Sequence, residues 1–384
     1  VYAPRPEGQA KALQRAYQTA GFGPETVELV EAHGTGTVAG DAAEFEGLRQ
    51  VYDAAGRADR QWCALGTVKS QIGHTKAAAG AAGLFKAVMA LHHGVLPPTI
   101  KVDRPNPKLE LEKSAFYLNT QTRPWVRGSE HPRRAGVSSF GFGGSNFHLA
   151  LEEYRGPARA LRKRTAPTEL VTLGADSPAA LVAALRGVEV GGAGFLQWFA
   201  RSSQESLARG AAARVAIVAA DEAELKARLA AAADAIEKAP QKPFSLPNGI
   251  HYGTGEREGG LAFVFPGQGS QEVGMGAGAA LVWPQALAAW DLAAGLPIEG
   301  GEKLQQVVFP RPVFSDEERK AQTERLRRTE WAQPGIGACS LAHLNLLSTL
   351  GVRPDCVGGH SFGEVMALHA AGAFDAATAL RIAR

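Results

Sequence analysis

The stretch Gly66–Gly80 (GTVKSQIGHTKAAAG) constrains the fold of this 384-residue chain more than any other. It begins within a short apolar run, Cys63–Val68, passes through a polar turn that contains glycine, and continues into a series of alanines. Glycine lets the backbone approach a reacting group closely, because it has no side chain. His74 lies in this turn, and Lys69 lies five residues before it. The pattern predicts a strand, a tight turn and a helix, with His74 as a candidate hydrogen-bond donor.

Two further glycine-rich loops follow apolar runs in the same way. Val27–Val30 leads into Glu31–Thr37 (EAHGTGT), which contains His33, and Ser138–Asn146 (SSFGFGGSN) begins at the end of a predicted strand. The alternation of strands with helices, including a helix predicted over Thr75–His93, indicates a layered α/β fold. A lone histidine is usually structural, but two histidines on matching glycine turns, with a lysine between them, indicate a shared site.

A second block near the end of the chain repeats this design. Leu261–Phe265 is an apolar run suited to a buried strand, and it leads into the turn Pro266–Gln271 (PGQGSQ). Gly359–Gly363 (GHSFG) fits the pattern G-x-S-x-G, in which a strained strand-to-helix turn exposes a serine hydroxyl. A helical run through Ala371 follows, and the N-terminus of a helix favours an anionic intermediate. Ser361 is therefore a candidate nucleophile.

The two histidine motifs and the third loop together resemble the C-terminal half of a ketosynthase, the condensing domain of polyketide and fatty-acid synthases. The resemblance covers residues 1–153 and implies a thiolase-like layered fold. It also implies decarboxylative condensation of a malonyl thioester, in which His33 and His74 would donate hydrogen bonds to the enolate oxygen. Lys69 would orient His74 and bias the local protonation. Phe142 would gate the acyl channel, although a core aromatic beside a turn is an equally good interpretation of this residue.

The motifs PGQGSQ and GHSFGE closely resemble the malonyl/acyl-transferase family, whose domain is α/β-hydrolase-like. The resemblance implies that Ser361 is the nucleophile and that the backbone N–H groups of Gln268 and Phe362 form the oxyanion hole. The family's carboxylate-binding arginine and its histidine base would fall beyond Arg384, and the ketosynthase cysteine would precede Val1. We therefore expect a fragment of a longer synthase that is inactive by itself.

Cys339 lies in Gly337–Ser340 (GACS), which looks like the nucleophile motif of a condensing enzyme. It comes after both histidine motifs, however, and inside a helical run, Pro334–Leu350, that fits the acyltransferase. A buried and inert thiol is the better interpretation, because free cysteine commonly packs as a small apolar residue.

Asp41 and Glu44 follow the first histidine turn and open a predicted helix that ends near Ala55. Aspartate at the N-cap with glutamate three residues later matches the capping-box pattern. The ketosynthase family also has acidic residues at this place, so a chemical role is the alternative. We expect Asp41 to act mainly as the cap.

The block 154–258 contains no histidine or cysteine with catalytic potential, and it resembles the small α/β adaptor of modular synthases. Its predicted helix over Asp221–Glu237 begins with another capping pattern. We expect three domains: a ketosynthase C-terminal half at 1–153, this linker domain, and the start of an acyltransferase at 259–384. The segments VKSQIGHTKAAAG and GHSFGEVMALHAAGAF most resemble the corresponding segments of polyunsaturated-fatty-acid synthases.

Charge and cysteine usage exclude several classes of function. The 41 basic and 38 acidic residues give a formal charge of +3, whereas nucleic-acid binding needs clustered basic residues. Three scattered cysteines cannot form a disulfide framework, and they indicate a reducing cytoplasm. No run approaches the ~18 apolar residues of a membrane span. We also expect no metal site.

The resemblance implies substrates that are acyl and malonyl thioesters, carried on coenzyme A or on the phosphopantetheine of an acyl carrier protein, with no cofactor bound directly. The carrier protein would be the partner, and ketosynthases of this family form homodimers. One alternative is a serine hydrolase or thioesterase, although PGQGSQ and the absence of an HGGG loop argue against it. The other is a degenerate module kept as a docking scaffold, against which the intact His33, His74 and Ser361 argue.

Overall fold

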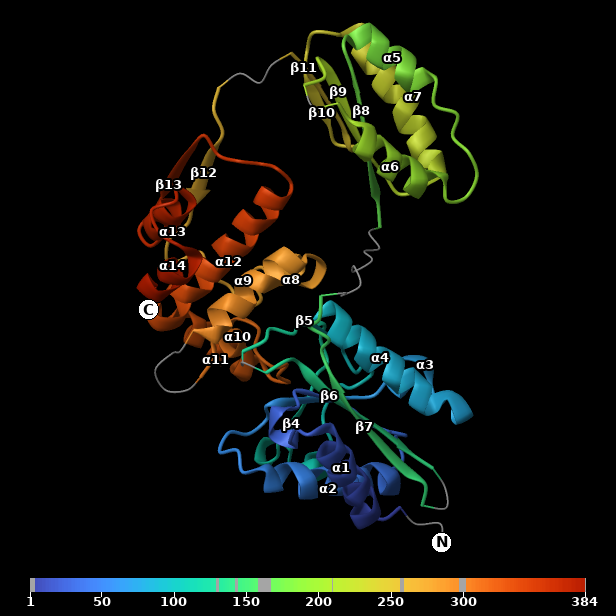
Figure 1. Ribbon diagram of the computed structural model, residues 1–384, viewed down its shortest axis with the longest axis vertical. Helices are drawn as coiled ribbons and strands as arrows, with labels where there is room; N and C mark the ends of the chain where they lie inside the picture. Colours follow the sequence, from blue (N-terminus) through green and yellow to red (C-terminus); the bar gives the residue numbers. More distant parts are fainter. Residues whose placement is uncertain are drawn as a thin grey trace. The chain divides into compact units, whose positions relative to one another are not determined.

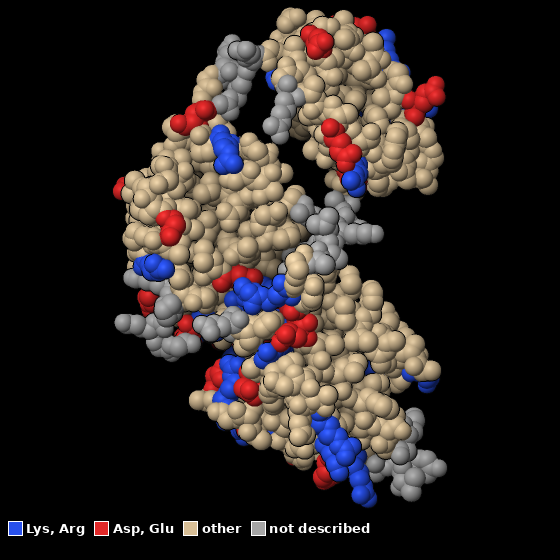
Figure 2. All heavy atoms as spheres, in the orientation of Figure 1, with Lys and Arg blue, Asp and Glu red and all other residues tan. Residues whose placement is uncertain are grey.

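The computed structural model describes residues 4–128, 131–141, 144–157, 167–208, 210–255, 259–296 and 302–383. Packing separates the chain into two units, of which the first contains Val1–Arg162 with Gly260–Arg384 and the second contains Lys163–Gly259. Basic and acidic side chains are interspersed over the face drawn in Figure 2. Within the described ranges, no helix combines the length and the apolar character that crossing a membrane requires.

A five-stranded sheet forms the centre of the N-terminal block of the first unit. Its order is β4-β2-β1-β6-β7, with β1, β2, β4 and β6 parallel and β7 antiparallel to β6. The strands are β1 (Leu29–Glu31), β2 (Cys63–Gly66), β4 (Phe116–Leu118), β6 (Arg134–Phe140) and β7 (Asn146–Glu152). Every residue of β1 and β2 is buried, as expected for parallel strands with both faces covered.

Helices cover both faces of this sheet (Figure 1). They are α1 (Pro6–Ala20), α2 (Val38–Tyr52), α3 (Lys69–Ile72) and α4 (Ala79–His93), and the short strands β3 (Val95–Leu96) and β5 (Arg123–Pro124) pair beside them. One core cluster joins α1 and α2 to the sheet around Tyr52, and the other joins α4 to it around Trp125. The predicted helix over Thr75–His93 begins with a separate 3₁₀ turn, so α4 itself starts at Ala79.

The predicted cap of α2 is wrong. The helix begins at Val38, four residues earlier than a cap at Asp41 would place it, and the side chain of Thr37 accepts a hydrogen bond from Gly40 N at 3.2 Å. Asp41 lies in the first turn, where its carboxylate accepts from Gly36 N at 3.1 Å. Thr37 is also one of the residue types preferred at the N-cap and lies four residues earlier, and the helix starts there. Glu44 is thereby released from a capping role.

The second unit is a four-stranded antiparallel sheet with helices packed against it. The order is β10-β11-β9-β8, and the elements are β8 (Glu169–Ala175), β9 (Ala213–Ala219), β10 (Phe244–Leu246), β11 (Ile250–Thr254), α5 (Pro178–Arg186), α6 (Phe195–Ser206) and α7 (Glu222–Lys238). Alternate residues of β9 are buried in a core of its own that includes Leu225. Asp221 caps α7 by accepting from Glu224 N at 2.8 Å, which confirms the predicted start of this helix.

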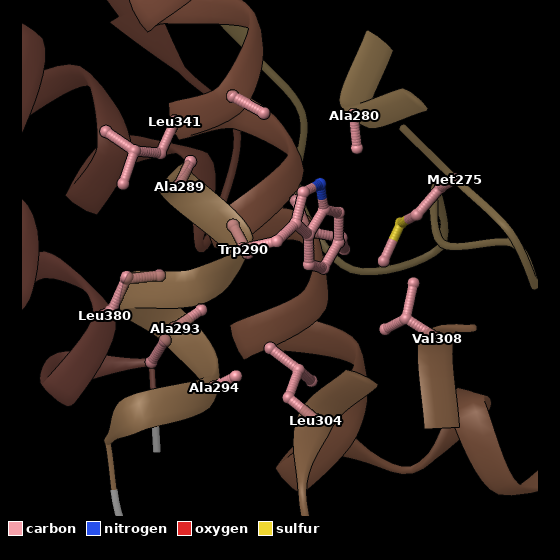
Figure 3. Close-up of a cluster of buried hydrophobic side chains, with 14 of the residues drawn as sticks. Met275, Ala280, Ala289, Trp290, Ala293, Ala294, Leu304, Val308, Leu341 and Leu380 are labelled. Carbon is pink, nitrogen blue, oxygen red and sulfur yellow. The ribbon is translucent and has the colours of Figure 1, made fainter. Parts of the chain in front are cut away.

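The C-terminal block of the first unit packs seven helices beside a two-stranded parallel sheet, within the described residues. The strands are β12 (Ala262–Phe265) and β13 (Cys356–Gly359), and the helices are α8 (Ala277–Val282), α9 (Pro284–Gly295), α10 (Leu304–Val308), α11 (Asp316–Arg327), α12 (Thr329–Thr349), α13 (Gly363–Ala370) and α14 (Ala376–Ile382). The core surrounds Trp290, which is 1% exposed and meets side chains from the neighbouring helices (Figure 3).

The prediction of a buried strand at Leu261–Phe265 is only partly right. A strand is present, but Val264 is 77% exposed and only Phe265 is buried. Among the described strands β12 pairs with β13 alone, and α13 packs beside the pair. An apolar run therefore identified the strand but not the extent of its burial.

A buried group of charges links the two blocks of the first unit. Arg133 is 2% exposed, and its guanidinium donates to Glu153 at 2.9 Å and to Asp291 on α9 at 2.7 Å. The backbone N of Arg127 also donates to Asp291, at 2.7 Å. Arg133 and Asp291 are 158 residues apart in sequence, so no local pattern indicates this contact.

Candidate active sites

His33 lies in the loop after β1, and a buried carboxylate holds its backbone. The N–H groups of His33 and Gly34 donate to the two oxygens of Glu44, at 2.7 and 2.8 Å. Glu44 is 5% exposed, and its burial raises its pKa to about 7 although both hydrogen bonds favour the charged form. Gly34 has a φ of +45°, and a Cβ there would lie 2.8 Å from Thr67, so the loop can approach β2 only with glycine at this position.

His74 faces His33 at the end of the neighbouring strand's turn. The two rings are 5.7 Å apart between centroids and nearly perpendicular, at 89°. The Nδ1 atom of His74 accepts a hydrogen bond from Lys76 N at 3.0 Å, so this nitrogen carries no proton. The imidazole is therefore neutral in this arrangement, with its N–H at Nε2. His74 is an uncharged hydrogen-bond donor.

His33 is also held in the neutral form. Burial lowers its pKa to about 4, and the positive charge of Lys69 acts in the same direction. The Nδ1 atom of His33 is buried without a hydrogen-bond partner within the described residues. The structure thus brings two of the predicted site residues together as neutral imidazoles.

Lys69 begins α3 and is half-buried beside these rings. Burial lowers its pKa, and the carboxylates of Glu44 and Glu31 oppose this effect. Within the described residues it makes no hydrogen bond to His74, the residue it was expected to orient. Its positive charge lowers the pKa of His33.

The aromatic residue beside His33 is Phe140, at the end of β6. Its ring centroid lies 5.8 Å from that of His33, at an interplanar angle of 56°. Phe142, the predicted gate, lies outside the described residues. No local pattern assigned Phe140 a role in the site, because its contact with His33 is made to a loop more than a hundred residues earlier.

Ser361 lies on the strained turn that the G-x-S-x-G pattern predicts. It has a φ of +53°, an uncommon conformation for a residue with a side chain, and it separates β13 from α13. A Cβ on Gly359 would lie 2.1 Å from Gly363 C, and one on Gly363 would lie 2.1 Å from Phe265 O. Both glycines are therefore required by the close approach of the backbone.

The PGQGSQ turn lies directly against this elbow. A Cβ on Gly267 would be 2.5 Å from His360 O and 3.0 Å from Ser361 Cβ. The side chain of the next residue, Gln268, donates to Thr329 Oγ1 at 3.2 Å. The Ser361 hydroxyl makes no hydrogen bond to a base within the described residues.

Phe362 is the second residue whose backbone N–H is predicted to form the oxyanion hole. Its side chain is 6% exposed and packs against α12, where a Cβ on Gly337 would meet it at 3.2 Å. This packing fixes the residue that follows the serine. The structure therefore brings Gln268, Ser361 and Phe362 together around one turn.

Cys339 on α12 is less buried than expected. Its Sγ lies 3.7 Å from His343 Nδ1, and it lines a cavity of ≈ 490 Å³ together with Met275 and Ile336. Burial still raises the pKa of this thiol to about 11, so the neutral, weakly nucleophilic form dominates at neutral pH. The described residues contain no cluster of His, Cys, Asp and Glu that could hold a metal ion.

Comparison with known proteins identifies the parts of the chain. Residues 1–103 match the family model "Beta-ketoacyl synthase, C-terminal domain", 105–191 match "Ketoacyl-synthetase C-terminal extension", and 262–384 match "Acyl transferase domain". A polyunsaturated fatty acid synthase polypeptide of Thraustochytrium sp. is 36% identical over 98% of this chain. The three parts of the chain match ketosynthase and acyltransferase models, and the relatives that it matches over almost its whole length are polyketide and polyunsaturated-fatty-acid synthases. The predicted α/β class, with a ketosynthase part and an acyltransferase part, is confirmed.

The relatives are much longer than this chain. It covers 14% of the Thraustochytrium protein and 5% of Polyketide synthase GfsA of Streptomyces halstedii, to which it is 36% identical over its whole length. A solved ketosynthase from module 1 of the bacillaene synthase of Bacillus amyloliquefaciens is 33% identical, with a TM-score of 0.38 over 66% of this chain and 42% of that one. Since polyketide and polyunsaturated-fatty-acid relatives are equally similar, the narrower subtype stays a prediction.

Proposed function

We propose that the N-terminal block supplies the decarboxylation half of a ketosynthase site, with His33 and His74 as neutral hydrogen-bond donors. The observation that carries this proposal is the pair of facing uncharged imidazoles, with His74 fixed as the Nε2–H tautomer by Lys76 N. When the malonyl C–C bond breaks, carbon dioxide leaves and the electron pair moves onto the thioester oxygen as an enolate. Donors placed beforehand stabilise that charge without adding a formal positive charge of their own.

We propose that the C-terminal block contributes an acyltransferase nucleophile, Ser361. The carbonyl of an acyl or malonyl thioester would be attacked by its hydroxyl, and the backbone N–H groups of Gln268 and Phe362 would stabilise the resulting oxyanion. The strained elbow and the close approach of the PGQGSQ turn support this assignment. No described residue that contacts Ser361 corresponds to the family's base or to its carboxylate-binding arginine. We therefore expect both of them elsewhere in the complete protein.

The wider assignments follow from these two sites. We propose that the substrates are acyl and malonyl groups carried on coenzyme A or on the phosphopantetheine of an acyl carrier protein, and that the complete synthase is a cytoplasmic homodimer. We propose the division into a ketosynthase part at 1–153, a linker at 154–258 and an acyltransferase part at 259–384. The extension match at 105–191 crosses the first of these boundaries.

The ketosynthase assignment is tested with His74→Ala in the complete protein that contains this chain. Release of carbon dioxide from a malonyl thioester should fall by about a hundredfold to a thousandfold, because one oxyanion donor is lost. Acyl loading of the ketosynthase cysteine should persist, since that step forms no enolate. Undiminished release of carbon dioxide would show that His74 is not a donor.

The acyltransferase assignment is tested by intact mass after incubation with malonyl-coenzyme A. The complete protein should gain a malonyl adduct that Ser361→Ala removes and the control Cys339→Ala retains. Transfer of the malonyl group to a carrier thiol supports a transferase, whereas transfer to water alone would support the hydrolase alternative. An adduct that persists in Ser361→Ala would mean that the elbow is not the acylation site.

A further inference from the structure

A buried ion pair joins the end of β1, two residues before His33, to α4. The Nζ atom of Lys86 on α4 lies 2.9 Å from the Oε2 atom of Glu31, the last residue of β1. Its other oxygen accepts a hydrogen bond from the backbone N of Val68. The side chains of Glu31 and Lys86 are 2% and 9% exposed. Both oxygens of the carboxylate are therefore occupied by fixed donors.

Two glycines in the surrounding backbone leave room for this ion pair. A Cβ on Gly83 would lie 3.1 Å from Glu31 Cγ, and a Cβ on Gly66 would lie 3.7 Å from Lys86 Nζ. Burial raises the pKa of Glu31, while the charge of Lys86 and the hydrogen bond from Val68 oppose that effect. The pair is thus held in a buried site by two directional contacts, one from Lys86 Nζ and one from Val68 N.

Each end of these contacts leads to a residue of the histidine site. His33 follows Glu31 by two residues, Lys69 follows Val68, and α4 begins five residues after His74. One carboxylate thereby ties β1, the start of α3 and α4 to one another. Among the described residues, no other ion pair joins any two of these three elements.

We propose that the Glu31–Lys86 pair is a positioning device that keeps His33, Lys69 and His74 in one arrangement for decarboxylation. This inference rests on the ketosynthase function proposed above. A buried ion pair is weak grounds for stability, because desolvation offsets its attraction, and an apolar pair of the same volume would serve as well for packing. Directional contacts at a fixed point instead control geometry, and a misplacement of about 1 Å can cost about a hundredfold in rate.

Two variants of the complete protein separate positioning from stability. Glu31→Gln with Lys86→Met removes both charges together, keeps an acceptor for Val68 N and leaves no unpaired buried charge. Gly83→Ala keeps the pair but pushes Glu31 aside, and it replaces glycine within α4 by a better helix former. Both variants should retain the hydrogen-exchange protection of the β1 and α4 amides.

For each variant, kcat for carbon dioxide release from a malonyl thioester should fall about tenfold to a hundredfold. KM for that thioester and the rate of cysteine acylation should stay unchanged, a split that general loss of structure would not produce. Lys86→Arg, which preserves the charge, should recover most of the rate. The matched control is Lys113→Met, because Lys113 pairs with Glu110 on the surface of the same block.

The outcomes are separable from those of the proposed function. If His74→Ala slows decarboxylation but the double variant and Gly83→Ala run at the wild-type rate while folded, the positioning role is refuted alone. If His74→Ala itself leaves the rate unchanged, the ketosynthase assignment fails. Should the double variant lose exchange protection, Gly83→Ala decides, since the wild-type rate in that variant refutes positioning and a selective loss of kcat supports it.

Discussion

Acidification should loosen the N-terminal block through His148, a buried residue of β7. Its Nδ1 atom hydrogen-bonds with Ser138 Oγ at 3.0 Å and its Nε2 with the Tyr17 hydroxyl at 3.0 Å, and Tyr17 continues to Tyr52 at 2.6 Å. The residue is 8% exposed, and burial lowers its pKa to about 3. The native state therefore keeps the imidazole neutral, whereas an unfolded histidine takes up a proton near pH 6.5.

The sign and the size of the effect follow from this difference. Between about pH 3 and pH 6.5 the unfolded state binds more protons, so the free energy of unfolding falls as the pH is lowered through this window. The contribution of His148 should fall by about 2 kcal/mol between pH 7 and pH 5. Glu44 acts in the opposite direction, because its raised pKa of about 7 makes its contribution decrease as the pH rises from 4.5. A comparison of variants is needed to isolate His148.

The assay is hydrogen exchange of the β6–β7 amides at pH 7 and pH 5, corrected for the intrinsic exchange rates. His148→Gln offers a donor and an acceptor but does not titrate, so its opening free energy should fall by about 2 kcal/mol less than that of the wild type. Glu44 is common to both proteins and cancels in the difference. His251→Gln, at an exposed position of β11, should behave as the wild type. An equal pH dependence in His148→Gln and the wild type would refute the reasoning.

Two further predictions concern the elbow and the buried charges. Gly363→Ala should lower the free energy of unfolding by at least about 3 kcal/mol and abolish malonyl loading measured by intact mass, because its Cβ would overlap Phe265 O at 2.1 Å. Gly358→Ala, whose Cβ meets nothing within 4 Å, should load malonyl normally. Normal loading in both variants would contradict the steric argument. Arg133→Met should lower the opening free energy of β7 and α9 amides by about 3–5 kcal/mol, because the guanidinium that neutralises Glu153 and Asp291 is lost. The exposed Arg186→Met should lower it by only about 0–1 kcal/mol, and equal losses would count against this explanation.

Features set by local sterics could be predicted from the sequence. The elbow at Ser361 follows from glycines that the backbone itself requires. The strand-to-turn pattern correctly placed His33 in the loop after β1, whereas the short helix α3 separates His74 from the neighbouring strand β2. The cap of α2 was mispredicted at Asp41 because Thr37, another residue type preferred at the N-cap, lies four residues earlier and caps the helix instead. Local patterns succeed where one segment decides the outcome and fail where two nearby residues compete.

Features that join distant segments left no local pattern. Glu44 holds the backbone of His33, yet its place in the sequence suggested only a helix cap. Glu31 and Lys86 are on a strand and a helix whose apolar patterns are dominated by their neighbours, and Arg133 meets Asp291 across 158 residues. A charged residue in an apolar element signals a buried partner, but identifying that partner requires the fold.

The strand register of the second unit has a mechanical consequence. The chain enters the sheet at Glu169, opposite Ala219, and leaves it after Thr254, opposite Ala213, at the other end of β9. Hydrogen bonds in an antiparallel ladder run perpendicular to the strands, so a pull on these two ends loads the ladders in shear. Many bonds must then yield together, whereas the β6–β7 hairpin, with Arg134 opposite Glu152, would unzip one bond at a time. The second unit can therefore carry tension along the chain without lengthening.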